Sequence, residues 1–296
     1  MVQDSLRQTD RASCGAQAST LFPAVDRGAQ SALLVRRGEV VPSMRNTVTF
    51  NMLGRYGRLA NQMYQIAGVI GVARRNGFDF AFPYWKNYDH LERFGSSEDI
   101  DIQKHFVNPL PLYDGPALPD YPVEWGYREV NLTHSVSLSG HFQSTKYFEH
   151  ALMEVKWYLR MKDEPALNHY VAVHVRRGDY DDKYHPRIPE SYYRAAMAEF
   201  PDCSFLVFSD DISACKEMFG DEVEYSEGRD YLQDFKLMKR CRHFIIGNSS
   251  YSAMAAILGE HPDKAVVAPR PWFGPAYAQI TGEDIYSDDW KVINWR

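Results

Sequence analysis

Two adjacent arginines follow an apolar run in the middle of this chain. In Tyr170-Val-Ala-Val-His-Val-Arg-Arg-Gly-Asp-Tyr180, the apolar part predicts a buried β-strand that ends at Val175. A guanidinium can grip a phosphate with two parallel hydrogen bonds, so this strand end is a candidate anion site. Because side chains alternate across a strand, we expect Arg176 and Arg177 to point in different directions. For an arginine pair taken alone, a solvated surface turn is the alternative.

Two further polar clusters follow predicted strands. Ser209-Asp210-Asp211 comes after the strand 204–208, and Asn248-Ser249-Ser250 comes after the strand 243–246 and begins a predicted helix. Each cluster alone is most simply a helix cap. A helix N-terminus also offers free N–H groups to a phosphate, and ligands of parallel sheets bind beyond the carboxyl ends of the strands. Together with the arginine pair, these clusters predict a pocket for a nucleotide diphosphate.

The elements that must position these residues alternate regularly. The pattern predicts strands at 170–175, 204–208, 223–225, 243–246 and 265–268, and helices at 189–200, 211–219, 230–241 and 249–258. Strands that alternate with helices imply the α/β class and a doubly wound parallel sheet with right-handed crossovers.

Upstream, a second α/β unit is predicted. A strand at 47–53, a glycine-punctuated turn, a helix at 59–75 that Asn76-Gly77 ends, and a strand at 78–82 make a β-α-β beginning. A strand at 135–141 and a helix at 146–159 follow. The intervening residues 83–130 are rich in Pro, Tyr and Asp, which predicts long loops of the kind that recognise substrates.

Composition excludes several classes of protein. The 296 residues carry a net charge of −6, which disfavours a nucleic-acid partner. No apolar run approaches the roughly 20 residues that span a membrane, and the first residues lack the apolar core of a signal peptide. None of the four cysteines lies in a C-x-x-C pair, so zinc and redox motifs are absent and a reducing, cytoplasmic location is expected.

Five ordered segments resemble the α-1,2-fucosyltransferase family, whose members use GDP-fucose. His174-Val-Arg-Arg-Gly-Asp179 is similar to the H-x-R-R-x-D element of such enzymes, and Gly57-Arg-Leu-Ala-Asn-Gln-Met-Tyr64 to the G-R-L-G-N-Q-M-F opening of the family. Gly140-His-Phe-Gln-Ser-Thr-Lys-Tyr-Phe148 resembles its G-Y-F-Q-S-x-K-Y-F segment. Phe208-Ser-Asp-Asp211 and Asn248-Ser-Ser-Tyr-Ser252 resemble two further elements. The resemblance covers residues 48–296.

The sequence departs from the family's pattern at two places. Ala60 stands where the family has Gly, which bears on close backbone approach to the donor. Ala253-Met254 replaces a Trp-Trp pair, a change that concerns either packing or the acceptor cleft. Residues 1–45 match nothing in the pattern.

The resemblance implies a GT-B-like fold of two Rossmann-like lobes. It implies an inverting transfer of L-fucose from GDP-fucose to the 2-hydroxyl of a terminal galactoside on a glycan, with no metal or other cofactor required. We expect a poorly ordered extension at 1–45, an N-terminal lobe on the acceptor side at 46–163 and a C-terminal GDP-sugar-binding lobe at 164–296. The sequence carries no signal for an oligomeric state.

The resemblance also gives the candidate residues roles. Arg176 would neutralise the leaving β-phosphate, as a preorganised cation can, while Arg58 and Asn61 would close over the diphosphate and sugar. Asp234 matches an aspartate that contacts guanine. The acceptor hydroxyl either needs a base, for which His185 and Asp179 are candidates, or reacts unassisted; Asp179 could instead orient an arginine. The remaining donor-side candidates are His174, Arg177, Ser209, Asp210, Asn248, Ser249 and Ser250.

Other functions compete with this hypothesis. The chain could transfer a different sugar from a GDP donor, or be a non-catalytic module that binds nucleotide sugars or glycans. A Rossmann oxidoreductase is disfavoured because no G-x-G-x-x-G lies between a strand and a helix. The D-x-D triplets Asp99-Ile-Asp101 and Asp179-Tyr-Asp181 are too short to indicate a metal site.

Overall fold

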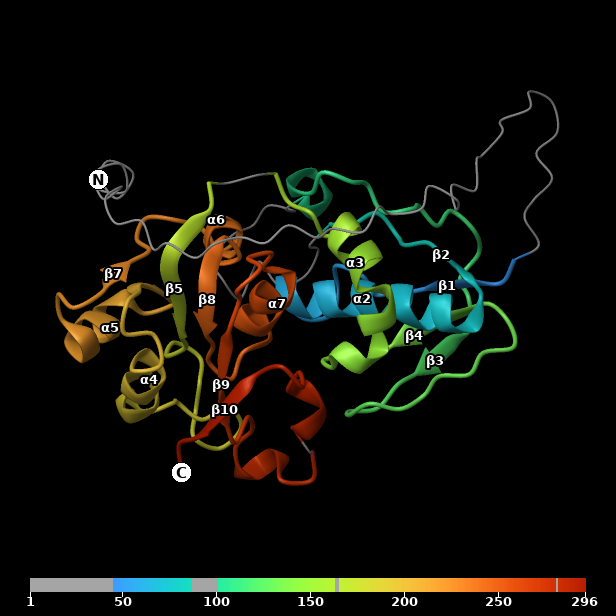
Figure 1. Ribbon diagram of the computed structural model, residues 1–296. Coiled ribbons are helices and arrows are strands. Elements are labelled where there is room, and N and C mark those ends of the chain that lie inside the picture. The colour runs from blue at the N-terminus through green and yellow to red at the C-terminus, as the bar shows by residue number, and fades with distance from the viewer. Residues whose placement is uncertain (1–44, 87–100, 163–164, 281) are drawn as a thin grey trace. The chain divides into compact units, whose positions relative to one another are not determined.

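A computed structural model describes residues 45–86, 101–162, 165–280 and 282–296, and residues 44–296 form one compact unit. Nearly all of the extension expected at 1–45, and Asp99 of the first D-x-D triplet, lie outside the described residues. The described part of this unit contains two parallel β-sheets, each accompanied by helices (Figure 1).

The larger sheet has the order β10-β9-β8-β5-β6-β7, and all of its pairings are parallel. The chain runs from β5 outward to β6 and β7, then returns to the other side of β5 for β8, β9 and β10. Such a reversal of strand order opens a crevice beyond the carboxyl ends of the two strands beside it. Here those strands are β5 and β8. The six strands are β5 (Leu167–Val175), β6 (Ser204–Ser209), β7 (Glu224–Tyr225), β8 (Cys241–Ile245), β9 (Val266–Arg270) and β10 (Lys291–Asn294).

Helices cover both faces of this sheet. The helices are α4 (Glu190–Met197), α5 (Ile212–Phe219), α6 (Tyr231–Met238) and α7 (Ser250–Leu258). Figure 1 shows α4 and α5 on one side and α7 on the other. The alternate residues Val171, Val173 and Val175 of β5 are buried against Tyr192, Tyr193 and Phe219 of α4 and α5. Side-chain N-caps fix the first residues of α5 and α6. The Asp211 carboxylate accepts from Ala214 N, and Asp230 and Gln233 form a capping box.

The smaller sheet has the order β2-β1-β4-β3 and is also parallel. Its strands are β1 (Thr47–Thr49), β2 (Asp79–Phe80), β3 (Asp120–Pro122) and β4 (Val136–Ser139), and the helix α2 (Leu59–Asn76) connects β1 to β2. Gly77 ends α2 in the left-handed conformation, at φ 68°, which glycine adopts without steric cost. The apolar helix α2 is buried along most of its length and also contacts α7.

Several boundaries differ from the predictions. β1 ends at Thr49, because the residues after it fold into a turn with positive φ at Gly54 and Gly57. The helix predicted at 146–159 is broken into two 3₁₀ turns, Thr145–Tyr147 and Glu149–Ala151, followed by the short α3 (Leu152–Tyr158). Strands β3 and β10 were not predicted, since a three- or four-residue edge strand carries little periodicity.

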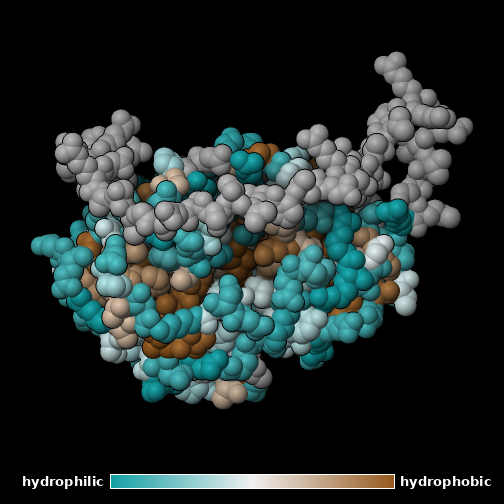
Figure 2. All heavy atoms as spheres, in the orientation of Figure 1, coloured by the Kyte–Doolittle hydropathy of each residue, from teal (hydrophilic) through white to brown (hydrophobic). Residues whose placement is uncertain are grey.

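The fold class is confirmed: two Rossmann-like lobes, each built on a parallel sheet, form a GT-B-like arrangement with a doubly wound sheet in the C-terminal lobe. The face drawn in Figure 2 is mostly hydrophilic at its rim, with apolar side chains gathered in its middle. Among the residues that the structure describes, no helix is both long and apolar enough to cross a membrane.

Candidate functional site

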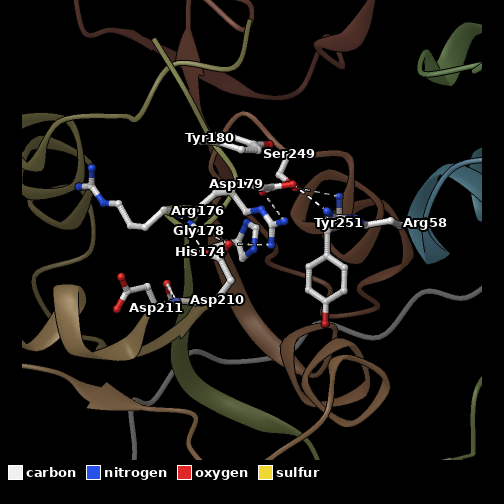
Figure 3. Close-up of polar contacts among 12 residues, drawn as sticks. Arg58, His174, Arg176, Gly178, Asp179, Tyr180, Asp210, Asp211, Ser249 and Tyr251 are labelled. Carbon is white, nitrogen blue, oxygen red and sulfur yellow. Dashed lines mark hydrogen bonds and ion pairs between the residues drawn. The ribbon is translucent and has the colours of Figure 1, made fainter. Parts of the chain in front are cut away.

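Arg176 lies directly beyond the carboxyl end of β5, at the crevice. Its guanidinium contacts two carboxylates, with Nη2 2.6 Å from Asp179 Oδ1 and Nη1 3.0 Å from Asp210 Oδ2 (Figure 3). The side chain is 17% exposed. Arg177 points elsewhere, because its Nη2 lies 3.8 Å from the sulfur of Met218. The alternation predicted for the pair is present, and Arg176 is the member at the crevice.

Asp210 holds the arginine loop in place. Its two carboxylate oxygens each accept a 2.9 Å hydrogen bond from the backbone N–H groups of Arg177 and Gly178. A Cβ on Gly178 would lie 2.5 Å from Asp210 Oδ2, so only glycine allows this approach. Ser209 Oγ accepts from Asp211 N at 3.0 Å. Ser209 and Asp210 were both expected to bind the donor. In the structure, their side chains contact the backbone of this chain.

Asp179 joins the two lobes. Its Oδ2 lies 2.7 Å from Nη2 of Arg58, the N-cap residue of α2, while its Oδ1 accepts from Arg176. Partial burial acts to raise the pKa of Asp179, but the charges of Arg176 and Arg58 prevail and hold it below its usual range. Figure 3 shows Arg58 reaching the Asp179 carboxylate from the α2 side. Three of the predicted catalytic residues are therefore in one charged network.

Asn61, on the first turn of α2, contacts residues of both lobes. Its Oδ1 accepts from Gln143 Nε2 at 2.9 Å and from Ser250 Oγ at 2.8 Å. The turn before it requires glycine: Gly57 has φ 79°, and a Cβ there would lie 2.6 Å from the Asn61 Cβ. The close spacing in the Gly57-to-Asn61 segment is therefore a packing requirement.

Two glutamines of α2 hold the same turn, a role that the sequence did not reveal. Gln62 Nε2 donates to the carbonyl of Gly57 and Gln65 Nε2 to that of Tyr56, both at 2.9 Å. Gln62 also accepts from the indole N–H of Trp85 at 2.7 Å. Buried glutamines on an otherwise apolar helix are the available signal, because a buried amide needs partners.

The three polar residues at the start of α7 make different hydrogen bonds. Ser249 Oγ caps the helix by accepting from Tyr251 N at 3.3 Å. The buried Asn248 donates its amide to the carbonyls of Pro186 and Trp272, at 3.0 and 3.1 Å, which ties α7 to two loops. Of the three residues expected to bind phosphate, Ser250 alone contacts Asn61 of the other lobe. Asn248 binds two loops, and Ser249 caps α7.

His174 is buried beneath the crevice. Its Nδ1 lies 3.0 Å from Ser252 Oγ, and its ring packs against that of Tyr251. Burial, assisted by the charge of Arg176, lowers the pKa of His174 to about 3, so the ring is neutral at physiological pH.

Asp234 lies on α6, beside the other end of Tyr251. The Tyr251 ring packs against Phe235, and the Asp234 carboxylate accepts from Ser226 Oγ at 2.6 Å. Burial raises the pKa of Asp234 to about 6, although the Ser226 hydrogen bond acts to lower it. A half-buried carboxylate close to an aromatic ring suits the recognition of a flat base that donates N–H groups.

The ring of Tyr180 lies between His185 and Arg176 and contacts both side chains. The two rings of His185 and Tyr180 stack at 5.3 Å, and the Arg176 guanidinium lies 5.5 Å from the Tyr180 centroid. Burial lowers the pKa of His185. Within the described residues, His185 Nδ1 is buried without a hydrogen-bond partner. Tyr180, which the sequence did not single out, also donates to the carbonyl of Asn248 at 2.9 Å.

The departures from the family pattern lie in the core. Ala253 and Met254 are fully buried in α7, so this change concerns packing. Ala60 is buried at the first turn of α2. In the second D-x-D triplet, Asp179 contacts the two arginines, and Asp181 Oδ1 accepts from the backbone N–H groups of Lys183 and Tyr184.

The chain is similar to several known proteins. Residues 130–294 match the model of Glycosyl transferase family 11. An alpha-1,2-colitosyltransferase from Escherichia coli is 29% identical over 261 residues, which are 73% of this chain and 90% of the relative. The galactoside alpha-(1,2)-fucosyltransferase 2 of Hylobates lar is 25% identical over 73% of this chain and 70% of its own. A crystal structure of POFUT1 in complex with GDP-fucose aligns with a TM-score of 0.47 and 13% identity, over 75% of this chain and 98% of that one.

Proposed function

This chain belongs to glycosyl transferase family 11, and from that membership we propose that it transfers L-fucose from GDP-fucose to the 2-hydroxyl of a terminal galactoside. The glycosyltransferase activity follows from the family, and the donor and acceptor are the proposed part. The observation that carries the proposal is the pair of arginines, Arg58 and Arg176, that meet at Asp179 across the crevice. Two guanidiniums from opposite lobes suit a diphosphate held between them.

Arg176 is the proposed leaving-group residue. Negative charge develops on the β-phosphate as the bond to fucose breaks, and a cation already fixed beside that oxygen lowers the barrier. Asp210 holds the loop that carries Arg176, so little reorganisation is needed when the donor binds. The Asp179 carboxylate contacts both arginines, and the diphosphate would compete with it for them.

The other proposed contacts with GDP-fucose follow from where each side chain lies around Arg176. Ser250 and Asn61 meet at 2.8 Å between the lobes, which suits them to bind the phosphate and the sugar from opposite sides. Asp234 would accept from the N1 and N2 hydrogens of guanine while Tyr251 flanks the base. The neutral His174 would offer a hydrogen bond without adding charge.

The transfer should pass through an oxocarbenium-like transition state, as glycoside hydrolysis does. Two groups have the protonation state that a base requires: the neutral His185 and the ionised Asp179. We favour His185, because the Asp179 carboxylate already contacts two arginines. The proton of the acceptor 2-hydroxyl would pass to His185 as the oxygen attacks the anomeric carbon and GDP departs.

We propose that the reaction needs no divalent metal, since Arg176 and Arg58 supply positive charge at the diphosphate. Activity that is unchanged after dialysis against EDTA would support this, and a rate that Mg²⁺ or Mn²⁺ restores would contradict it.

A second donor has a specific observation in its favour. The 29% identity to an alpha-1,2-colitosyltransferase extends over 90% of that protein, and colitose is L-fucose without its 3-hydroxyl. Initial rates with GDP-fucose and GDP-colitose, using methyl β-D-galactopyranoside as the acceptor and GDP-mannose as a control donor, would decide between them. A higher kcat/KM for GDP-fucose and an α-1,2 linkage in the NMR spectrum of the product are expected. Preference for GDP-colitose would assign the second donor.

A further inference from the structure

Three adjacent strands of the N-terminal lobe end at one edge of their sheet. In the order β1-β4-β3, the segments beyond the carboxyl ends carry Tyr56, His141 and Trp125. This is the edge at which parallel sheets bind ligands. The corresponding edge of the C-terminal lobe carries Arg176, so each lobe contributes its strand ends to a ligand site.

The three side chains form one aromatic surface. The His141 ring stacks on Trp125 with centroids 4.3 Å apart and an interplanar angle of 20°. The Tyr56 hydroxyl lies 2.8 Å from His141 Nε2. Trp125 and Tyr56 each keep 39% of their surface exposed. Two exposed aromatic side chains held by the half-buried His141 ring form a preformed surface for an apolar face of a ligand.

Polar groups border this surface. Trp125 and His141 line a pocket together with Gln143, Ser144, Glu124 and Asp284. Within the described residues, His141 Nδ1 is buried without a hydrogen-bond partner. Asp284 accepts from Lys146 Nζ at 2.6 Å and from Tyr127 N at 2.9 Å, which fixes the far wall.

The pocket adjoins the donor site on two sides. Gln143, one of its lining residues, donates to Asn61, which Ser250 of the other lobe also contacts. Trp125 packs edge-on against Phe273 at 5.7 Å, and Phe273 lies 6.0 Å from the His185 ring. Phe273 therefore packs against both Trp125 and the proposed base, His185.

We propose that Trp125 and His141 form the acceptor platform: the terminal galactose stacks on the Trp125 indole, and His141 and Gln143 bind its hydroxyls. This inference rests on the proposed function. The hydrogens on C3, C4 and C5 of a β-galactoside lie on one face, and an indole matches that apolar face. In this arrangement Gln143 and His141 Nδ1, which line the adjoining pocket, would bind hydroxyls at the ring edge, and the 2-hydroxyl would be directed toward His185.

A second pocket, of about 180 Å³, lies beyond the end of β9 and includes Phe273, Tyr277 and Arg270. Its lining comes from one strand and the segment after it, and Arg270 is paired with Glu283 at 2.9 Å. The pocket beside the platform is only about 10 Å³, so the sugar ring would lie on the exposed indole and not inside that pocket. We prefer the platform because it draws on three strands and contacts Asn61 through Gln143.

The test compares two tryptophans. In Trp125→Ala, we expect the KM for methyl β-D-galactopyranoside to rise about tenfold or more, which corresponds to a loss of about 1.4 kcal/mol, because the apolar face of the sugar loses its aromatic partner. Hydrolysis of GDP-fucose by water should not change. Trp157→Ala removes a tryptophan of the same lobe that is 52% exposed and packs on Tyr158, and it should leave both quantities unchanged. His141→Phe, which keeps a ring but no nitrogen, should raise the KM less than Trp125→Ala.

Binding of the same galactoside, followed by saturation-transfer NMR in the presence of GDP, separates the two proposals. Loss of the signal in Trp125→Ala but not in Trp157→Ala supports the platform, whichever donor is used. An undiminished signal in Trp125→Ala, or no signal with the unchanged protein, overturns it. If the platform binds galactoside but GDP-fucose is neither hydrolysed nor transferred, the donor proposal fails and the acceptor platform stands.

Discussion

Arg58 and Asp179 are joined by a 2.7 Å ion pair although 121 residues separate them in the chain. One comes from the turn that begins α2, and the other from the loop beyond β5. Because Asp179 also contacts Arg176, a single carboxylate links the contact between the lobes to the arginine proposed to bind the leaving group. Any anion that displaces Asp179 would therefore act on both lobes at once.

Replacement of Arg176 tests the leaving-group role directly. In Arg176→Ala, kcat should fall about 100- to 1,000-fold, the usual cost of one preorganised donor to a developing anion. Arg176→Lys keeps a charge but loses the two-pronged geometry, so its kcat should be intermediate. The exposed Arg187 of the same loop supplies the control, and Arg187→Ala should be fully active. Initial rates of GDP release at saturating donor give kcat, and wild-type rates in Arg176→Ala would refute the assignment.

Asp179→Asn tests whether the carboxylate competes with the diphosphate. Both arginines would lose a negative partner, so GDP should bind about fivefold more tightly by isothermal titration, which corresponds to roughly 1 kcal/mol. The melting temperature should fall slightly. The lowered pKa of Asp179 means that its stabilising contribution is present above the ordinary carboxyl pKa and is lost as the pH falls through the folded-state value. Unchanged or weaker GDP binding would mean that Asp179 and the diphosphate do not compete.

The sequence predicted the elements whose signals are local and strong. The apolar run before Arg176 required a strand, and the spacing of 59–75 with Gly77 behind it required a helix; both are present. The family assignment is confirmed by the match over residues 130–294. The alternation of strands and helices also predicted that Arg176 would lie beyond the carboxyl end of its strand. The strand order, which reverses beside β5, was not predicted.

The rest depended on tertiary contacts. A polar residue after a strand has the same local sequence whether it faces a ligand or a neighbouring loop, so Asp210 could not be distinguished from a donor-binding residue. Trp125 follows the three-residue edge strand β3, in a segment that has no periodicity of its own. The helix predicted at 146–159 begins only at Leu152, because the Tyr147 and Phe148 backbone packs so closely on Gly71 of α2 that a Cβ there would lie 2.1 Å from the Tyr147 carbonyl.

Donor affinity should depend on the ionisation of Asp234. Its pKa is raised to about 6, and only the carboxylate can accept both guanine hydrogens. The ionised fraction falls to about one tenth at pH 5, so the Kd for GDP-fucose should be about tenfold higher there than at pH 8. The two phosphates of a GDP-sugar do not titrate in this range, so the protein is the source of the change. Asp234→Asn should bind GDP-fucose weakly, with a Kd that does not change between pH 5 and 8. If the Kd of the wild-type protein is also independent of pH, Asp234 does not contact the guanine.

The proposed base has a different pH signature. Burial holds the pKa of His185 below its ordinary value of 6.5, so at saturating donor and acceptor the kcat should be constant at neutral pH and decline only on the acid side of 6.5. Saturation removes the effect of Asp234, which acts on donor binding. His185→Gln should lower kcat for transfer to the galactoside about 100-fold, the usual contribution of a general base, and should abolish the acid limb. The KM for GDP-fucose should not change, because His185 is assigned no donor contact. If the acid limb persists in His185→Gln, the proton of the acceptor goes elsewhere, and the same profile recorded in Asp179→Asn tests the other candidate.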